Sequence, residues 1–549
     1  MSAQPAPATL TEALTAVAAA HPRVRAHFWS VGETMENAEL HRLSRNTAAA
    51  LVRSGVERGE PVGILAPNAP EFLVAFFGVA AAGAAATPLP LPAGARQTAS
   101  YPGKLSAITR AAGMRTVLVS PRFAELTALL GDIGVRFVPT DTLLDDDRDT
   151  PLPALTPAHQ AVVQFTSGST ATPKGVRLTH ANVMAGLAAI RRGIALDLTD
   201  RGGFWLPLFH DMGLFGTLSA VLRGIPADVW SPLAFVKDPA RWLGEFARCG
   251  TTITAMPNFG YEALLGAVSA EDAARLDLRH WRIAFNGAEP ISQEVVTAFC
   301  ERFAPAGFAP SAMFGVYGMA EATLAVAFPP LGRAPVFEHV DRADLSERFL
   351  ARETAPDAPD SRAVAGVGAA VEGVALRVVD GDGAELPDGA VGEILIQGAP
   401  VTTGYLTVDP DAVADRFTAD GWLRTGDLGY RRAGELFVTG RCKDMITVRG
   451  VNYYAQDVEA AVRALPGVYK GRCTAAVDTE TPETIALIAE TERTGPAADE
   501  LAAAVRAAVA GSLGLAAVRV LLVAPRTIPR TSSGKLRRLA ARELLAGQH

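Results

Sequence analysis

The sequence predicts an α/β protein built from more than one domain. Its 549 residues exceed what one compact hydrophobic core usually contains. Helix and strand patterns alternate between residues 10 and 155, which is typical of a layered α/β domain with a largely parallel sheet. We expect a large N-terminal domain, residues 1–441, in which residues 366–440 form a β-rich part. Residues 442–549 are expected to form a small α+β C-terminal domain.

The first elements of the N-terminal domain follow from apolar periodicity. Residues 72–88 form the longest uncharged apolar run, but alanine and glycine dominate it, and prolines at its end indicate a buried helix leading into a strand. We therefore expect no membrane span. The expected helices are Leu40–Val56 and Pro70–Ala82, and the expected strands are Pro61–Ala66, Thr116–Ser120 and Arg136–Pro139.

Later elements are predicted by periodicity and by capping residues. Leu178–Ile190 has the pattern of a helix. Another helix is expected just after Ile291, because Ser292 can cap its first turn and Glu294 lies within that turn. Residues 374–397 alternate apolar and polar side chains and predict an antiparallel hairpin. In the C-terminal domain we expect strand, strand, helix, strand, strand, helix and strand, in that order.

Charge and cysteine content exclude several classes of protein. The net charge is −7, and no basic cluster precedes the one formed by Lys535, Arg537 and Arg538. Nucleic acid is therefore not expected as a partner. The four cysteines are widely spaced and form no C-x-x-C pair, so neither a disulfide framework nor a zinc site is predicted. Residues 1–8 lack the features of a signal peptide, and we expect a cytoplasmic protein.

Residues 166–175, T-S-G-S-T-A-T-P-K-G, have the composition of a phosphate-binding loop. They follow the apolar run 161–165, which we expect to form a short buried strand. Small hydroxyl and glycine residues leave N–H and O–H groups free to contact a phosphate, and Lys174 adds positive charge. The stretch differs from the P-loop of nucleotide hydrolases, because its lysine follows proline and precedes glycine. Taken alone, it could also be a flexible connector.

This stretch resembles the phosphate loop of the adenylate-forming superfamily, which contains acyl-CoA synthetases, adenylation domains of nonribosomal peptide synthetases, and luciferases. Members of that superfamily activate carboxylic acids with ATP. The resemblance implies the adenylate-forming enzyme fold, with a large N-terminal domain and a small mobile C-terminal domain. It also implies contacts with ATP from Thr166, Ser167, Gly168, Ser169, Thr170 and Lys174.

Residues 205–213, W-L-P-L-F-H-D-M-G, resemble the superfamily segment that borders the carboxylate and the acyl pocket. The H-D-M-G form resembles the fatty acyl-AMP ligase branch. The resemblance implies a catalytic position for His210 and places Phe209 and Met212 in the acyl pocket. A lone histidine is more often structural, and the adjacent His210 and Asp211 need not face one another.

Residues 254–262 contain P-N-F-G-Y, which also resembles the fatty acyl-AMP ligase branch near its acyl tunnel. The resemblance adds Met256, Phe259 and Tyr261 to the acyl pocket. By residue type alone, all three are equally suited to core packing.

Residues 282–290, R-I-A-F-N-G-A-E-P, predict a strand and a glycine turn before the helix that follows Ile291. Ligands bind in crevices at the carboxyl ends of parallel strands. The segment resembles the superfamily's adenine-contacting turn, which implies nucleotide contacts from Gly287, Ala288 and Glu289. Alone, it is also compatible with an ordinary strand-to-helix turn.

Residues 317–323, Y-G-M-A-E-A-T, have the groups that a magnesium nucleotide requires. A magnesium ion that bridges ATP phosphates takes one or two oxygen ligands from the protein. Glu321 and the Thr170 hydroxyl meet this need, and the resemblance gives both a catalytic, Mg²⁺-binding role. It also places Tyr317 against adenine, with Gly318 and Met319 beside it. The ending A-E-A-T resembles fatty acyl-AMP ligases more than CoA ligases.

Four residues in the last quarter of the chain complete the expected site. Asp427 lies in a glycine-flanked segment, where a buried carboxylate can accept hydrogen bonds from two ribose hydroxyls. By resemblance, Arg441 reaches the ribose and phosphates, and Lys443 is the hinge. Lys535, on a glycine-containing loop, corresponds to the catalytic lysine that contacts ATP. A surface charge cluster and the basic start of a helix are the alternatives for these segments.

The polar, proline-rich residues 331–365 resemble the insertion that disfavours CoA in fatty acyl-AMP ligases, although a variable surface loop is the alternative. The branch implies activation of a fatty acid with ATP and Mg²⁺ to acyl-AMP, with release of pyrophosphate. The acyl group would then pass to the phosphopantetheine thiol of a separate acyl carrier protein. CoA as the acceptor is the alternative, and a non-catalytic nucleotide-binding homologue is a weaker one.

Overall fold

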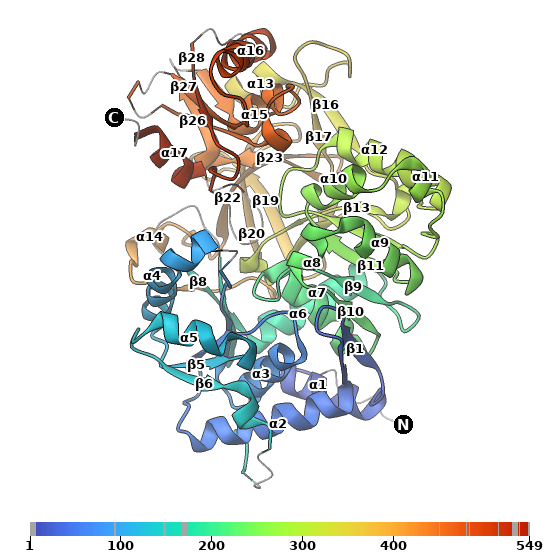
Figure 1. The fold of residues 1–549 in the computed structure, drawn as a ribbon, viewed down its shortest axis with the longest axis vertical. Helices are drawn as coiled ribbons and strands as arrows, with labels where there is room; N and C mark the ends of the chain where they lie inside the picture. The colour runs from blue at the N-terminus through green and yellow to red at the C-terminus, as the bar shows by residue number, and fades with distance from the viewer. Residues whose placement is uncertain are drawn as a thin grey trace.

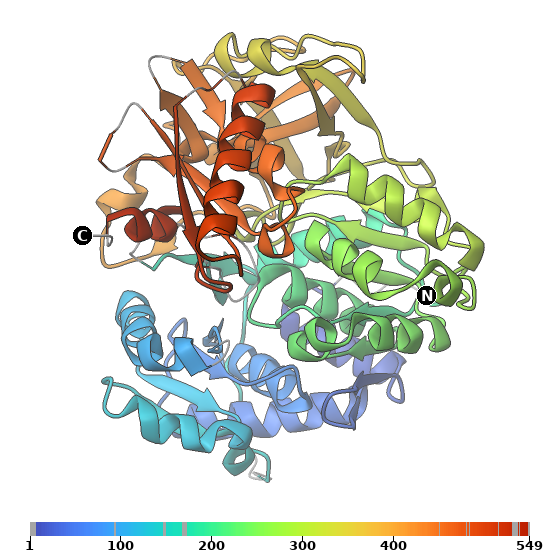
Figure 2. The ribbon, with the colours of Figure 1, turned by 45° about the horizontal axis from the view of Figure 1, so that its top comes forward.

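The structure is a computed structural model. It describes residues 7–92, 95–145, 150–166, 173–448, 451–478, 480–481, 484–513, 515, 517–529, 536 and 538–546. The blue N-terminal elements lie at one end of the long axis and the red C-terminal elements at the other (Figure 1). Seen from a second direction, the red C-terminal elements lie beside the yellow and orange strands (Figure 2).

A first seven-stranded sheet contains the strands predicted for the N-terminal part. Its strand order is β21-β8-β7-β4-β3-β5-β6. The five strands from β7 to β6 pair in parallel, as expected, whereas β8 and β21 extend the sheet by antiparallel pairing. The bounds are β3 Pro61–Leu65, β4 Ala85–Pro88, β5 Thr116–Val119, β6 Arg136–Pro139, β7 Gln160–Phe165, β8 Gly175–Thr179 and β21 Tyr405–Leu406.

The helix predicted for residues 178–190 starts two residues later than expected. Residues Gly175–Thr179 form β8, an antiparallel partner of β7 that the sequence did not reveal. Helix α6 spans His180–Gly193, and the Thr179 hydroxyl oxygen caps it by accepting from the backbone N–H of Asn182 at 3.1 Å. The phosphate-loop residues between β7 and β8, 167–172, lie outside the described residues.

A second seven-stranded sheet has the order β13-β12-β11-β9-β10-β1-β2, and only its edge pair β1–β2 is antiparallel. Helix α12, Gln293–Phe303, begins where the sequence predicted, and the Ser292 side chain accepts from the N–H of Val295. The strands are β1 Arg25–Phe28, β2 Glu33–Glu36, β9 Gly202–Phe204, β10 Ala227–Val229, β11 Ile253–Met256, β12 Ile283–Asn286 and β13 Met313–Gly315.

Helices pack into one hydrophobic core with both sheets. The predicted buried helix is α3, Pro70–Ala81, in which every residue but Glu71 is buried, and it leads into β4 as expected. The predicted helix α2 begins three residues early and spans Asn37–Arg53. Among the described residues, no helix is long and apolar enough to cross a bilayer. Helices α1 Leu10–Ala20 and α7 Asp211–Arg223 also contribute to this core.

Antiparallel strands follow the two large sheets. The predicted hairpin is confirmed by β19, Val374–Val379, which pairs with β20, Gly392–Gly398. These strands continue into a four-stranded sheet with β22, Leu423–Arg432, and β23, Glu435–Arg441. Residues 331–365 contain the paired strands β16 Phe337–Asp341 and β17 Ser361–Ala365, with helix α13 Arg342–Glu347.

The C-terminal elements occur in the predicted order and have a hydrophobic cluster of their own. This cluster runs from Ile446 to Val518. The elements are β24 Met445–Val448, β25 Val451–Tyr454, α15 Ala455–Arg463, β26 Cys473–Val477, β27 Ile485–Glu490, α16 Pro496–Leu513, β28 Val518–Val523 and α17 Arg538–Ala546.

The side chain of Asn68 links the two large sheets. It is 5% exposed and follows β3 of the first sheet. Its amide nitrogen donates to the carbonyls of Leu206 and Trp230, both at 2.9 Å, and its oxygen accepts from the N–H of Leu208 at 3.0 Å. These three groups follow strands of the second sheet, so Asn68 connects the two sheets by hydrogen bonds.

We predict that Asn68→Ala lowers the free energy of unfolding by about 3 kcal/mol, because buried polar groups that lose their partners cost ~1–3 kcal/mol each. Urea unfolding, followed by tryptophan fluorescence, measures this change. The matched control is Asn46→Ala, which removes a single bond to the Leu144 carbonyl at 2.7 Å. Equal losses for the two variants would contradict the linking role of Asn68.

Candidate active site

One large cavity lies where the second sheet, the antiparallel strands and the C-terminal elements meet. Its volume is about 2650 Å³. The structure brings most of the predicted and described site residues to its wall. These are Thr166, Lys174, Phe209, His210, Met212, Phe259, Ala288, Glu289, Tyr317, Gly318, Met319, Glu321, Asp427, Arg441 and Lys443.

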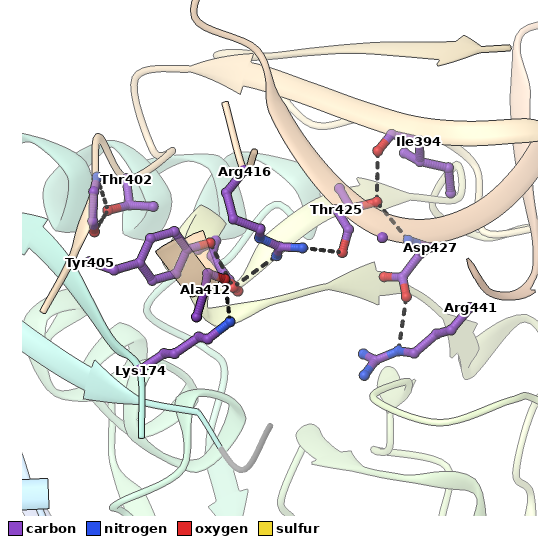
Figure 3. A network of polar contacts seen from close by, with 12 residues as sticks. Lys174, Ile394, Thr402, Tyr405, Ala412, Arg416, Thr425, Asp427 and Arg441 are labelled. Carbon is purple, nitrogen blue, oxygen red and sulfur yellow. Dashed lines mark hydrogen bonds and ion pairs between the residues drawn. The ribbon is translucent and has the colours of Figure 1, made fainter. Parts of the chain in front are cut away.

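The cross-strand pair of Asp427 and Arg441 forms one end of the polar part of the cavity. The two residues face each other in register on β22 and β23, and the Arg441 Nε lies 2.9 Å from the Asp427 Oδ1 (Figure 3). Asp427 is 5% exposed, and its Oδ2 accepts from the Tyr317 hydroxyl at 2.7 Å. Burial and the Asp427 charge hold the pKa of Tyr317 well above its ordinary value, so this hydroxyl stays a donor. Carboxylate oxygens have about four acceptor positions, which leaves Asp427 able to bind further hydroxyls.

Glu321 forms the other end of the polar part. It lies on the short 3₁₀ turn Ala320–Ala322 and is 8% exposed. Its Oε1 accepts from the Tyr405 hydroxyl at 3.1 Å, and Arg416 Nη2 lies 3.5 Å away. The other Arg416 terminal nitrogen, Nη1, lies 3.5 Å from the carbonyl oxygen of Thr425, two residues before Asp427 (Figure 3). Arg416 thus spans the space between the two carboxylates.

Lys174 lies at the same wall as Arg416. Its Nζ donates to the carbonyl of Ala412 at 2.6 Å (Figure 3). Burial, followed by repulsion from Lys443 and Arg416, lowers the pKa of Lys174 from its ordinary value. Lys174, Arg416 and Lys443 all line the cavity, and this set of positive charges suits an anion better than a neutral ligand.

Two backbone turns expected to contact adenine depend on glycine and on an unusual φ. Ala288 has a φ of 68°, in the left-handed region. A Cβ on Gly318 would lie 2.1 Å from the Leu324 carbonyl oxygen, so no other residue fits there. Gly287 does not line the cavity, because it packs against Val316, where a Cβ would lie 2.9 Å from that side chain. The turn therefore presents Ala288 and Glu289 to the cavity.

His210 and Asp211 do face one another, although they are adjacent in the chain. The His210 Nδ1 lies 2.6 Å from the Asp211 Oδ1. Their positions follow from the start of α7, because His210 is its N-cap residue and Asp211 its first residue. The contact fixes the imidazole orientation and leaves Nε2 as the remaining ring nitrogen.

Apolar residues line another part of the cavity, which we call the apolar arm. Phe209, Met212 and Phe259 are among them. Met256 and Tyr261 lie instead in the buried core, and the Tyr261 hydroxyl donates to the carbonyl of Phe285 at 2.8 Å. Sequence reasoning missed most of the arm, which is also lined by Ile190, Ile194, Gly202, Phe204, Gly216, Ser219, Ala220, Ile225, Ile253 and Ala255.

Comparison with known proteins decides the family. Residues 14–406 match the AMP-binding enzyme family over more than half of the chain. This chain belongs to the AMP-binding enzyme family. A relative from Caulobacter vibrioides (strain NA1000 / CB15N), provisionally named an acyl-CoA synthetase, is 36% identical over 560 residues, which cover 98% of this chain and 96% of the relative.

Two further members of this family have names that specify a fatty acyl substrate. JamA of Moorena producens (strain JHB), a medium-chain-fatty-acid–[acyl-carrier-protein] ligase, is 34% identical over 526 residues, covering 92% of this chain and 88% of JamA. A solved structure from structural and functional studies of fatty acyl-adenylate ligases from E. coli and L. pneumophila has a TM-score of 0.90 and 32% identity. It covers 98% of this chain and 97% of that chain. The adenylate-forming fold expected from the sequence is thereby confirmed.

Some residues expected to bind nucleotide in this AMP-binding enzyme lie outside the described part of the chain: Ser167, Gly168, Ser169, Thr170 and Lys535. Among the described residues, no group of three or more His, Cys, Asp or Glu side chains could hold a metal alone. Glu321 nevertheless fits a magnesium nucleotide, because the ion takes most of its ligands from phosphates and water and needs one or two hard oxygens from protein.

We predict that Arg416→Gln raises the pKa of Lys174 toward its ordinary value. Arg416 carries a positive charge that repels the protonated Lys174, and it also neutralises part of the negative charge of Glu321. Without the guanidinium, the repulsion is lost and Glu321 attracts the protonated amine more strongly, so both changes raise the pKa of Lys174. The pH dependence of competitive acylation at Lys174, followed by mass spectrometry, measures this shift. Arg424→Gln is the control, since Arg424 lines the same cavity but bonds to Glu393 at 2.7 Å. An unchanged Lys174 titration in Arg416→Gln would show that the cations do not interact.

Proposed function

We propose that the protein is a fatty acyl-AMP ligase, which converts a fatty acid and ATP to acyl-AMP and pyrophosphate. The observation that carries this proposal is one continuous cavity with two kinds of wall. Its polar part contains Asp427, Arg441 and Glu321, and its apolar arm starts beside His210. A nucleotide and a hydrocarbon chain can therefore meet in one space, with the carboxylate between them.

In the proposed reaction the fatty carboxylate attacks the α-phosphorus of ATP, and the bond to pyrophosphate breaks. Asp427 would accept from the ribose hydroxyls, and Arg441 would contact the ribose and phosphates. Lys174 would stabilise the charge that builds on the phosphate oxygens. Glu321, with Thr170, would hold Mg²⁺, which neutralises phosphate charge. Since the resemblance also places Lys535 at the reacting phosphate, we propose that it orients the carboxylate.

His210 is proposed to contact the substrate carboxylate. His210 lines the cavity and lies two residues before Met212, the first residue of α7 in the apolar arm. Asp211 holds its Nδ1, so Nε2 is the nitrogen available to the substrate. Because Nδ1 donates to Asp211, Nε2 can donate only in the imidazolium form, and a hydrogen bond from the protonated ring would orient the carboxylate toward the phosphorus atom.

We propose that residues 1–441 and 442–549 act as separate domains, with residues 366–440 as a β-rich subdomain. The separate hydrophobic cluster after residue 445 supports this division. After adenylate formation, the smaller domain would turn about Lys443, withdraw Lys535 and admit a thiol to the acyl group.

We propose an acyl carrier protein as the acceptor and residues 331–365 as an insertion that disfavours CoA. These residues contact the C-terminal part: Arg342 Nη1 donates to the Ser512 carbonyl at 3.0 Å, and Arg362 lies 3.2 Å from Asp457. These contacts support the proposal that residues 331–365 restrain the C-terminal part and so disfavour the arrangement in which CoA would bind. The name of the Caulobacter relative favours CoA as the second candidate. ATP and a reduced carrier thiol fit a cytoplasmic location.

The acceptor is tested by intact-mass spectrometry with ATP, Mg²⁺ and a panel of fatty acids, offering CoA in one tube and a phosphopantetheinylated carrier protein in another. Acylated carrier with little acyl-CoA is the expected result, and rapid acyl-CoA formation would identify a CoA ligase.

Lys535→Ala should slow acyl-AMP formation at least about 100-fold, because it removes a group that stabilises the transition state. ATP binding without pyrophosphate exchange for any acid would indicate a non-catalytic homologue.

We predict that Asp427→Asn weakens AMP binding about 10- to 100-fold. The substitution replaces an acceptor oxygen by a donor and removes the charge, and hydrogen bonds to charged groups contribute ~1.5–3 kcal/mol. Isothermal titration calorimetry with AMP measures the affinity. Glu338→Gln is the matched control, since Glu338 accepts from the Tyr430 hydroxyl at 2.8 Å and does not line the cavity. Wild-type AMP affinity in Asp427→Asn would rule out the ribose contact.

A further inference from the structure

The apolar arm of the cavity runs along one face of α7. Met212, Gly216 and Ala220, each four residues apart, line it, and Ile225 lines it beyond the end of the helix. Because a helix rises ~1.5 Å per residue, the stretch from Met212 to Ala220 is about 12 Å long. The arm is thus long enough for a chain to lie parallel to the helix.

One aromatic ring lies against the middle of this face of α7, next to Gly216. Phe204, the last residue of β9, is 4% exposed and lines the cavity. A Cβ on Gly202 would lie 2.6 Å from this ring and a Cβ on Gly216 would lie 3.1 Å from it. The ring therefore rests against the backbone of β9 at Gly202 and against the backbone of α7 at Gly216. Side chains at these two glycines would occupy the space that the ring fills.

Phe285 and Phe328 line the same cavity from other strands, and their rings lie 5.5 Å apart. Among the described residues of α6, β9, α7 and β11 that line the cavity, Phe204 is the only one with an aromatic ring. Residues on both sides of it along α7, Met212 and Ala220, line the same cavity. The arm thus continues beyond the ring, and a ligand longer than the first part must pass Phe204.

We propose that Phe204 determines which acyl chain lengths the enzyme accepts. This inference rests on the proposed function, since it assumes a chain that enters beside His210. From His210 to Gly216 the arm covers about 9 Å of helix. An extended peptide spans ~3.5 Å over three backbone bonds, or ~1.2 Å per bond, so about seven carbons fit before the ring. The further stretch to Ala220 adds about five carbons.

This geometry predicts a break in the dependence of kcat/KM on chain length. Each methylene that is buried before the ring should raise kcat/KM about fourfold. The increase should stop where the chain meets Phe204, at a medium-length acid. Removing the ring should move the break toward longer acids by about five carbons.

The test compares Phe204→Ala with the wild-type enzyme on saturated acids from butyric to stearic acid. Pyrophosphate release gives kcat/KM for each acid, and the shift in thermal unfolding caused by each acid gives a second readout without turnover. Phe204→Leu is included in case the alanine variant does not fold. Phe235→Ala is the matched control, because Phe235 is fully buried and stacks on Trp205 at 3.8 Å but does not line the cavity.

A break that moves to longer acids in Phe204→Ala, and not in Phe235→Ala, is the expected result. Identical breaks in the wild type and in both Phe204 variants, or the same displacement in Phe235→Ala, would overturn the inference. If no acid supports pyrophosphate release by the wild type, the proposed function fails. The thermal-unfolding series would then still decide whether Phe204 limits chain length.

Discussion

The buried carboxylate of Asp427 is the constraint on which the site depends. A charge that is 5% exposed is stable only if donors surround it. The Tyr317 hydroxyl and the Arg441 guanidinium supply them, and they come from different sheets of the fold. The carboxylate therefore joins β14, Tyr317–Gly318, to β22 and β23. It also places the last residue of β23 at the start of the C-terminal part.

The sequence predicted those parts of the fold that depend on local pattern. The strands Pro61–Leu65 and Thr116–Val119, the buried helix α3 and the order of the C-terminal elements all follow from apolar periodicity. Strand β8 was missed, because its five residues begin with glycine and only pairing with β7 and β21 makes them a strand. Pairing between distant segments leaves little local signal.

The candidate site was predictable where its residues lie in recognisable segments. Tyr405 and Arg416 were missed because they reach Glu321 from segments more than eighty positions later in the chain, which carry no pattern of their own. Met256 and Tyr261 have side chains that suit either a pocket or a core, and only tertiary packing assigns them to the core. The apolar arm could not be predicted for the same reason, since its lining residues come one to four at a time from α6, β9, α7 and β11.

The continuity of the cavity has a consequence for how firmly the proposed acyl-AMP is held. Its nucleotide and acyl halves would occupy adjoining parts of one space, so the second half binds as if at millimolar or higher local concentration once the first is seated. Only one set of translational and rotational freedoms is lost for both halves. The activated acid would therefore dissociate far more slowly than either AMP or the free acid. Slow escape protects a mixed anhydride from hydrolysis in bulk water until an acceptor arrives.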